Sequence, residues 1–429
     1  MIINFSVQNF GSIKDQQTLS FEADNSDHLK NAYVVEVGGF RLLKLALIFG
    51  ANASGKTTLL KALDFLREVV LHPLSKKTEE LEFEPYLFDS HTPSQPSLIS
   101  IEFIQNEVKY TYELEFIKSA ILREELNFYK PKKANLFKRK TQLENQFAEL
   151  TFGGKVKIEK SIEKALAANT LWNNTVFGGF LKTNIEFPEL NEVVDWFRRN
   201  LKPVVYPNTD LSKFVTKRIK ENQVLKVDVL KVLKKADFRI SDLSISEEVQ
   251  EIPEVLVELL KKDAVKNGES ESTFSSQYTD LKLVMEHSIN NTSYILPFES
   301  ESSGTKRYYG FAGLLAMLLR SNSIIPIDEL ETSLHPDLVH HFLLSFIMND
   351  SQSQLIATTH HREILNNKDV FRNDIVWFTN MTSECTTELY SLADFGSDVV
   401  RNSTNILNAY KAGNLGGIPK PGDYFIEFD

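Results

Sequence analysis

A glycine-rich loop between an apolar run and a helical pattern constrains this chain most. The loop reads Gly50-Ala51-Asn52-Ala53-Ser54-Gly55-Lys56-Thr57, followed by Thr58, and has the spacing G-x-x-x-x-G-K-[ST]. Residues 45–49 before it are all apolar, as in a parallel strand buried on both faces, and leucines recur at helical spacing after it. When a strand, such a loop and a helix follow one another, the backbone N–H groups of the loop and the N-terminus of the helix face a phosphate. The pattern predicts an ATP site in which Lys56 contacts the β- and γ-phosphates and Thr57 contacts Mg²⁺.

Length, the distribution of apolar residues and cysteine content narrow the class of protein. A chain of 429 residues is long enough for two domains, or for one domain with a large insertion. It has no apolar stretch long enough to span a bilayer and no basic start typical of a secretory signal, so we expect a cytoplasmic protein with no membrane partner. The single cysteine, Cys385, excludes an intramolecular disulfide and a cysteine-based metal site.

A formal net charge of −10 argues against a surface that is basic overall, but two local basic clusters leave nucleic-acid contact open. The first cluster comprises Lys130, Lys132, Lys133, Lys138, Arg139 and Lys140 around Tyr129 and Phe137, and the second comprises Lys213, Lys217, Arg218 and Lys220. Alternation places the first cluster on an exposed hairpin. Runs of charge are usually solvated faces, and phosphate binding needs several such charges on one surface.

A second part of the predicted site lies far down the chain. Residues 323–327 form a short apolar run that ends in Asp328 and Glu329. A carboxylate at the end of a strand can hold Mg²⁺ through water, which is the role expected of Asp328, and a second can polarise the attacking water, which is the role expected of Glu329. Pro326 is unusual here, because proline cannot donate to a strand ladder.

Two weaker sequence patterns add residues to the predicted ATP site. Ser302, Ser303 and Gly304 precede a helical pattern, so hydroxyl groups and free N–H groups could meet an anion at the helix start. Residues 354–359 read as another buried strand, which ends in His360. Taken alone, the Ser302-Ser303-Gly304 segment is no more than a helix cap. A single histidine at the end of a strand, such as His360, usually has a structural role. With the loop at Gly50, they predict contacts to the γ-phosphate or to the attacking water.

The order of these four parts resembles that of the ATP-binding cassette (ABC) ATPases. The resemblance assigns Ser302-Ser303-Gly304 to the signature motif, Ser333-Leu334-His335-Pro336 to the D-loop and His360 to the switch histidine. In that superfamily the signature of one subunit completes the ATP site of another. The resemblance therefore implies a homodimer with composite ATP sites, and it leaves a higher oligomer open.

The two ends of the chain narrow the resemblance. The opening residues 3–13 resemble the first strand of RecF, SMC and overcoming-lysogenisation-defect ATPases, and the closing residues 410–419 also match this group. Together they look like the stand-alone AAA-family ATPases of phage-defence pairs such as the PARIS, RloAB and AbiL systems. The resemblance implies an α/β fold: an ABC/SMC-head-like P-loop NTPase with an antiparallel β subdomain and a compact helical insertion in place of the coiled coil.

We expect three regions along the chain. They are an N-terminal lobe at 1–155, a mainly helical insertion at 156–290 and a C-terminal lobe at 291–429 with the signature, the acidic pair, the D-loop and the switch histidine. Alternating segments between Glu82 and Phe152 predict antiparallel strands, and helical periodicity without heptads continues to about Val284. The polar segment 266–277 is expected to be a loop. Neither Gln95 nor Gln105 lies in a frame that identifies a Q-loop.

These features favour an ATPase that senses phage infection and controls a separately encoded toxic effector, expected to be a nuclease. Fused members of the lysogenisation-defect family carry a nuclease domain after the histidine, whereas the tail here has no Asp-x-Asp pair. The main alternative is a RecF- or SMC-like ATPase of DNA repair or chromosome maintenance that binds DNA as a clamp. A third hypothesis is a nucleotide-locked scaffold that hydrolyses little ATP, and Glu329 counts against it.

Overall fold

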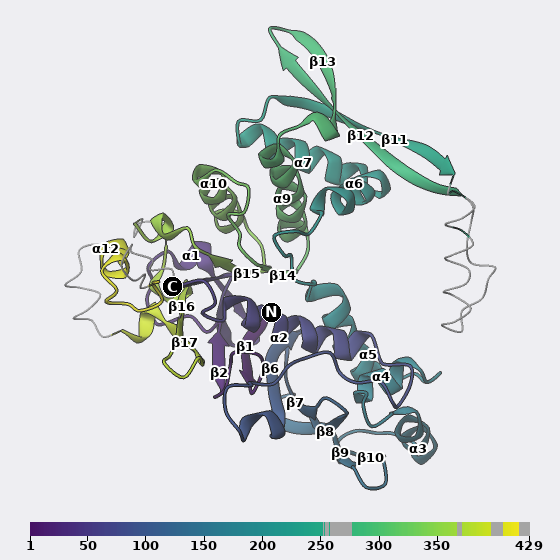
Figure 1. The fold of residues 1–429 in the computed structure, drawn as a ribbon. Helices are drawn as coiled ribbons and strands as arrows, with labels where there is room; N and C mark the ends of the chain where they lie inside the picture. The colour runs from purple at the N-terminus through teal and green to yellow at the C-terminus, as the bar shows by residue number, and fades with distance from the viewer. Residues whose placement is uncertain (252, 254–256, 258–276, 367–370, 396–405, 420–429) are drawn as a thin grey trace, which may run out of the picture. The chain divides into compact units, whose positions relative to one another are not determined.

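The computed structural model describes residues 1–251, 253, 257, 277–366, 371–395 and 406–419 (Figure 1). The chain divides into two compact units. The first unit comprises Met1–Pro207, Leu318–Thr332 and Leu343–Asp429, and the second comprises Asn208–Met317 and Ser333–Phe342. The boundaries expected at residues 155 and 290 do not coincide with the limits of these units.

A five-stranded sheet forms the centre of the first unit. Its order is β14 (Ile324–Ile327), β15 (Gln354–Thr359), β5 (Leu45–Gly50), β16 (Val376–Met381) and β17 (Thr387–Ser391). The first four strands are parallel, and β17 is antiparallel to β16. Every residue of β5 and β15 is buried, which confirms the expected buried strands. Carboxyl ends of parallel strands share one edge of a sheet, so Gly50 at the end of β5, Asp328 after β14 and His360 after β15 lie at the same edge.

The place of Pro326 in this sheet is now explained. β14 pairs with β15 on one side, and on its other side it meets residues 201–205. The Pro326 carbonyl accepts from the Val205 N–H at 2.9 Å, and the Asp328 N–H donates to the Val205 carbonyl at 2.9 Å. N–H and C=O of one strand residue point the same way, so the missing donor of Pro326 faces the irregular segment and not β15.

A seven-stranded antiparallel sheet forms the other sheet layer of the first unit and confirms the strands expected between Glu82 and Phe152. Its order is β10 (Phe147–Phe152), β9 (Lys133–Gln142), β8 (Ala120–Tyr129), β7 (Val108–Ile117), β6 (Ser97–Gln105), β1 (Ile2–Gln8) and β2 (Gln17–Ser20). A small hairpin, β3 (Val34–Val37) and β4 (Phe40–Leu43), follows the short helix α1 (Lys30–Tyr33).

Helices of the first unit cover these strands. They are α2 (Lys56–Leu71), α3 (Lys160–Asn169), α4 (Val176–Leu181), α5 (Pro188–Asp195) and the π-helical turn η2 (Trp196–Asn200). The Trp196 ring stacks on Phe103 of β6 with ring centroids 4.0 Å apart. The helices before residue 207 therefore belong to the core of the first unit and not to a separate insertion.

The second unit combines helices with an antiparallel three-stranded sheet. Its elements are α6 (Leu211–Glu221), α7 (Gln223–Lys235), β11 (Ile240–Glu251), β12 (Gln277–Ile289), β13 (Thr292–Pro297) and most of α9 (Ser303–Arg320), with the start of α10 (Pro336–Ile347). β11 and β12 pair over most of their length and lie along α7 and α6 (Figure 1). The remaining short elements are η1 (Thr92–Ser94), η4 (Phe298–Ser300), η5 (Arg362–Asn366), η6 (Asn373–Ile375), η7 (Leu392–Asp394) and α12 (Ile406–Lys411).

The helical periodicity expected to about Val284 is therefore wrong for β11 and β12. In β12, Leu283 and Met285 are buried, whereas Lys282 is exposed and Val284 is half-buried, which is the period of a strand with one buried face. Leu283 and Met285 pack in the core of the second unit together with Leu243 of β11. Of the expected polar loop at 266–277, residues 266–276 lie outside the described residues. Among the described helices, none has the length and apolar character needed to cross a bilayer.

Candidate functional site

The glycine-rich loop connects β5 to α2, as the sequence predicts. Gly55 has a φ of 97°, and a Cβ there would collide with the Thr387 hydroxyl of β17. The Lys56 ammonium donates to the carbonyl oxygens of Gly50 and Ala51, both at 2.9 Å. Lys56 is 6% exposed, and its burial lowers its pKa. The ammonium therefore sits over the loop in a partly desolvated position, where a phosphate would compensate for the lost water.

Hydroxyl groups from neighbouring strands brace both ends of the loop. The Ser54 hydroxyl is 2.6 Å from that of Thr379 on β16. At the helix start, the Ser12 hydroxyl is 3.1 Å from that of Thr58 and 2.8 Å from that of Thr387. Sequence reasoning did not find Thr379 or Thr387. In the sequence each is simply a threonine in a strand, and the partner of its hydroxyl depends on which elements are adjacent in the fold.

Thr57 and Asp328 meet in the structure, although they are far apart in the chain. The Thr57 hydroxyl donates to both carboxylate oxygens of Asp328, at 2.9 and 3.2 Å. The Thr358 hydroxyl of β15 donates to the same carboxylate at 2.6 Å. Asp328 is 4% exposed, so these donors stabilise its charge. A hydroxyl and a carboxylate at hydrogen-bond distance are oxygen ligands of the kind Mg²⁺ prefers, so these two residues fit the metal expected from the sequence.

Glu329 adopts a backbone conformation that is uncommon for a residue with a side chain. Its φ is 49°, and its N–H donates to the Thr358 hydroxyl at 2.8 Å. Within the described part of the chain, its carboxylate accepts one long hydrogen bond, from the Thr332 hydroxyl at 3.2 Å. Left-handed conformations of such residues cost free energy and cluster at functional sites. The backbone is therefore held firmly, while the carboxylate keeps acceptor capacity for a water molecule.

His360 follows β15 and is tied to a third acid. The His360 N–H donates to Glu331 at 2.6 Å, and the Thr359 hydroxyl donates to the other oxygen of that carboxylate at 2.7 Å. Desolvation, followed by the nearby Lys56 ammonium, lowers the pKa of His360. The imidazole is therefore neutral at pH 7. Sequence reasoning missed Glu331, although it follows the acidic pair Asp328-Glu329 by only one intervening residue.

Ser302, Ser303 and Gly304 open helix α9, as expected. The Ser302 hydroxyl accepts from the Thr305 N–H at 3.0 Å and so caps the helix. These three residues belong to the second unit, whereas the loop, Asp328, Glu329 and His360 belong to the first. A Cβ on Gly304 would have only ordinary contacts, with the Ser333 carbonyl oxygen at 3.4 Å nearest. No described residue of this unit comes close enough to require a glycine there.

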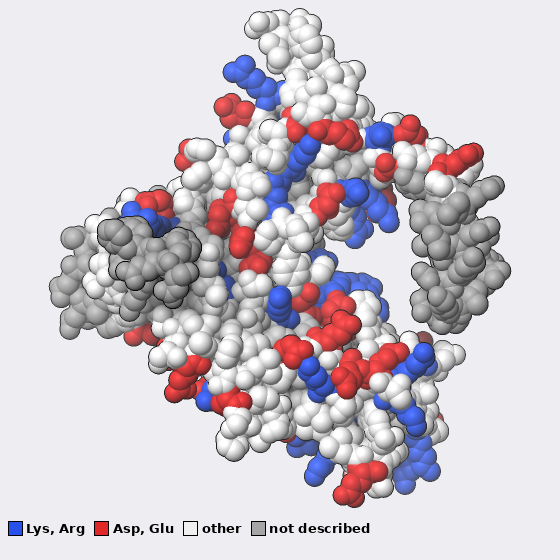
Figure 2. All heavy atoms as spheres, viewed as in Figure 1, with Lys and Arg blue, Asp and Glu red and all other residues white. Residues whose placement is uncertain are grey.

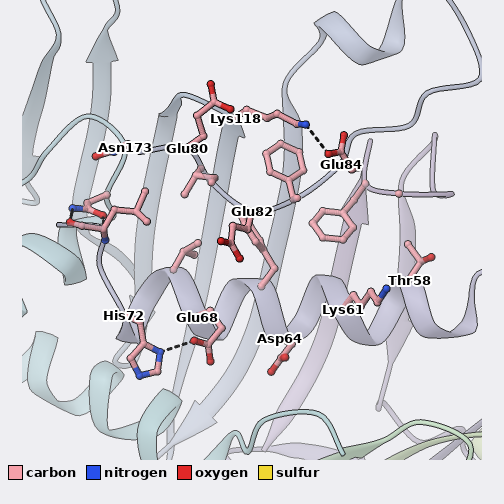
Figure 3. A pocket seen from close by; sticks show the side chains of 18 of the residues that line it. Thr58, Lys61, Asp64, Glu68, His72, Glu80, Glu82, Glu84, Lys118 and Asn173 are labelled. Carbon is pink, nitrogen blue, oxygen red and sulfur yellow. Dashed lines mark hydrogen bonds and ion pairs between the residues drawn. The ribbon is translucent and has the colours of Figure 1, made fainter. Parts of the chain in front are cut away.

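A cavity of about 1040 Å³ lies along α2, beside the loop (Figure 3). Thr58 lines it, but Lys56 and Thr57 do not. Its acidic lining residues are Asp64, Glu68, Glu80, Glu82 and Glu84, and Lys118 pairs with Glu84 at 2.7 Å. Such a lining repels phosphate. The cavity is therefore distinct from the candidate phosphate site.

Two of the six cations in the first basic cluster and three of the four in the second are buried or paired with acids. Arg139 is 1% exposed and donates to backbone carbonyls, including that of Ile121 at 2.7 Å, so it is unavailable to a partner. In the β8–β9 hairpin, Lys138 pairs with Glu125 at 3.4 Å. In the second cluster, Lys213, Arg218 and Lys220 pair with Asp210, Glu221 and Glu247, respectively. Figure 2 shows acidic and basic side chains interspersed over the visible part of the first unit.

The chain is similar to several proteins of known structure. Three solved structures are similar at 12% identity: an SMC head domain from Thermotoga maritima, an Smc head bound to the C-terminal winged-helix domain of ScpA, and an Smc head from Pyrococcus furiosus bound to the C-terminal domain of ScpA. Their TM-scores are 0.41, 0.43 and 0.40; they cover 91%, 91% and 96% of this chain, and 98%, 97% and 98% of their own.

No curated protein matches the chain. One family profile matches residues 45–366, from the first residue of β5 to the end of η5. It spans the P-loop, the signature residues, the Asp328-Glu329 pair and His360. The chain therefore belongs to the family described as "AAA domain, putative AbiEii toxin, Type IV TA system".

Proposed function

We propose that this chain is an ATPase that binds ATP with Mg²⁺ and hydrolyses it to ADP and phosphate. The observation that carries the proposal is the meeting of Thr57 with Asp328, because it unites the phosphate loop and the acidic strand in one polar site. Glu329 and His360 follow β14 and β15, whose carboxyl ends share an edge with that of β5. In P-loop enzymes this edge is where phosphates are bound.

Binding is the task of the loop and its lysine. Backbone N–H groups of residues 51–57 and the N-terminus of α2 would face the phosphates, and Lys56 would exchange its bonds to Gly50 and Ala51 for phosphate oxygens. Thr57 and Asp328 would hold Mg²⁺, which supplies neutralisation of phosphate charge when bound. The Thr358 hydroxyl keeps the Asp328 carboxylate in its orientation.

Hydrolysis needs a base that accepts a proton from water. Glu329 fits this role, because its backbone is anchored by Thr358 while, among the residues that the structure describes, its carboxylate has one long hydrogen bond, from Thr332. His360 is neutral, so its ring could accept or donate a hydrogen bond at the attacking water or the γ-phosphate. Glu331 acts indirectly, as the acceptor that orients the backbone of His360.

The assembled form we propose is a homodimer in which Ser302, Ser303 and Gly304 complete the site of the other subunit. The support is chemical. The start of α9 presents small residues, and Gly304 has room for a Cβ within its own unit. A position that tolerates a Cβ in the protomer but holds glycine is consistent with close approach by a ligand from elsewhere.

For the biological role, we propose control of a separately encoded effector, a nuclease, during phage infection in the cytoplasm. The support is the family, whose printed description names a toxin of a toxin–antitoxin system, a kind of system that pairs two proteins. We assign this chain the ATPase part of such a pair, because its polar site has the composition of an ATP site. Three of the four cations in the second basic cluster pair with acids, and in the first cluster Arg139 is buried and Lys138 is paired, which weakens the support for the DNA-clamp alternative.

The test is a phage-plating assay on cells that express the chain alone, the product of the adjacent gene alone, or both. We expect protection only with both proteins and only when Lys56 and Glu329 are intact, with Lys56→Ala and Glu329→Gln compared at equal protein abundance. Lys61→Ala is a matched control, since Lys61 is an exposed lysine of the same helix. Toxicity or protection from the chain alone would contradict effector control, and ATP hydrolysis stimulated by DNA would favour the clamp.

A further inference from the structure

A glycine turn near the end of the described chain lies beside the P-loop, and none of the roles above uses it. Gly416 and Gly417 have φ values of 67° and 64°. Half-buried Tyr390 and buried Tyr410 hold the turn: the Tyr390 hydroxyl donates to the Leu415 carbonyl at 2.7 Å, and the Tyr410 hydroxyl donates to the Gly417 carbonyl at 3.0 Å. These two hydrogen bonds therefore fix the position of the turn.

Gly417 lies against the residues from which the P-loop starts. A Cβ on Gly417 would be 3.2 Å from the Thr379 carbonyl oxygen and 3.6 Å from the Gly50 Cα. Thr379 and Gly50 are paired residues of β16 and β5. The first distance is tighter than ordinary side-chain contacts, and both neighbours are backbone atoms of a sheet. A side chain at 417 would therefore press on the sheet where β5 enters the loop.

Thr379 transmits this contact to the inside of the loop. Its hydroxyl is 2.6 Å from that of Ser54, which is 1% exposed, and it donates to the Phe49 carbonyl at 3.4 Å. A Cβ on Gly50 would collide with both the Thr379 and Ser54 hydroxyls. The space between Gly50, Ser54 and Thr379 is thus filled, and a shift of Thr379 must move the loop.

We propose that Gly417 is a positioning residue of the ATP site. The turn at 416–417 braces Thr379 and Gly50, and through Thr379 it sets Ser54, so that the N–H groups of the loop converge on the phosphates. This inference rests on the proposed ATP-binding function. Its physical basis is that small displacements of binding groups cause large losses of affinity or rate, while the fold itself persists.

The experiment measures ATP binding by calorimetry in full-length Gly417→Ala and in a matched control, Gly413→Ala. Gly413 belongs to the same segment and has a φ of 81°, but a Cβ there meets only the flexible end of Ile418, at 3.1 Å. Both variants introduce similar backbone strain. We expect the ATP Kd to rise about tenfold for Gly417→Ala and less than twofold for Gly413→Ala, with equal changes in Tm.

Steady-state kinetics separates KM from kcat, and a purely structural role would not raise KM for ATP while leaving kcat unchanged. The KM for ATP should rise in Gly417→Ala, while kcat at saturating ATP stays within about twofold of wild type, because Glu329 is untouched. Tyr410→Phe is the second variant, since it removes only the hydroxyl that holds Gly417 and keeps the ring against Phe49 and Phe378. It should raise KM about three- to fivefold.

The outcomes separate the two proposals. If the wild-type protein does not bind ATP, the proposed function fails. If the wild type binds ATP and Lys56→Ala binds it more weakly, but Gly417→Ala and Tyr410→Phe bind like wild type, the positioning role alone is overturned. Equal losses of affinity in Gly413→Ala and Gly417→Ala would also overturn it, because strain in the segment would then account for the effect.

Discussion

The Thr57 hydroxyl donates to the Asp328 carboxylate at 2.9 Å, although 271 positions separate the two residues. Thr57 is the second residue of α2, and Asp328 directly follows β14. The Thr358 hydroxyl fixes the same carboxylate from β15, which lies between β14 and β5 in the sheet. The phosphate loop and the acidic strand are thus joined by the strand order of one sheet.

Lys56→Ala should weaken ATP binding about ten- to hundredfold. Lys56 is buried over the loop, and a hydrogen bond to a charged group contributes about 1.5–3 kcal/mol. The measurement is a titration of both proteins with ATP and Mg²⁺. Lys61→Ala, on the exposed face of the same helix, should bind like wild type. Equal affinities for wild type and Lys56→Ala would remove the loop from the ATP site.

Glu329→Gln should retain ATP binding and lower hydrolysis at least about 100-fold. The amide keeps the size of the side chain and its hydrogen bonds, but it lacks the basicity to take a proton from water. Filter binding with labelled ATP should show intact nucleotide on the variant, whereas wild type should release ADP. Steady-state turnover close to wild type would show that another group, such as His360, activates the water.

Gly304→Asp should abolish hydrolysis by acting on the other subunit's site. The protomer has room for a side chain at this position, but a carboxylate near the γ-phosphate would oppose closure of the dimer. Mixed with Lys56→Ala, which is also inactive alone, it should recover part of the activity, because some mixed dimers carry one intact composite site.

The complementation needs its own controls. Gly304→Ala adds only a methyl group and should keep most of the activity. Subunit exchange has to be demonstrated separately, for example with two affinity tags. Absence of recovery despite exchange would count against composite sites that work independently of each other.

Glu124 should make the free energy of unfolding depend on pH near neutrality. Glu124 is fully buried; it accepts from the Tyr112 hydroxyl at 2.8 Å and from the Val176 N–H at 2.8 Å. Burial raises the pKa of Glu124 from 4.5 to about 7. The folded state therefore binds more protons than the unfolded state between these values. Stability from this group is present below pH 4.5 and is lost as pH rises through about 7.

Chemical denaturation of wild type and Glu124→Gln between pH 6 and pH 8 tests this sign. The stability of wild type relative to the variant should fall by about 1 kcal/mol as pH rises across that range. Arg139, the nearby buried cation, has its pKa lowered to about 10, so it does not titrate in this window. A difference that is constant with pH, or that grows as pH rises, would contradict the raised pKa.

Local patterns predicted much of the first unit. The buried run at 45–49, the alternation in the β6–β10 region and the acidic end of residues 323–327 each carry their signal within a few residues. The same approach failed for β12, because Leu281, Leu283 and Met285 were read within a longer helical pattern. Short apolar segments fit both periods until their core partners, such as Leu243, are known.

The sequence by itself determined the phosphate loop, since eight adjacent residues contain the glycines, the lysine and the hydroxyl that the geometry requires. It also identified Asp328, Glu329 and His360 as strand-end residues. Only the tertiary structure decided which groups hold them: Thr358 at Asp328 and Glu329, Glu331 at His360, Thr379 at Ser54, and Gly417 beside Gly50. The reason is physical. A hydroxyl or a glycine acquires its role from the neighbours that strand order and chain packing bring to it, and that order is not contained in any short stretch of sequence.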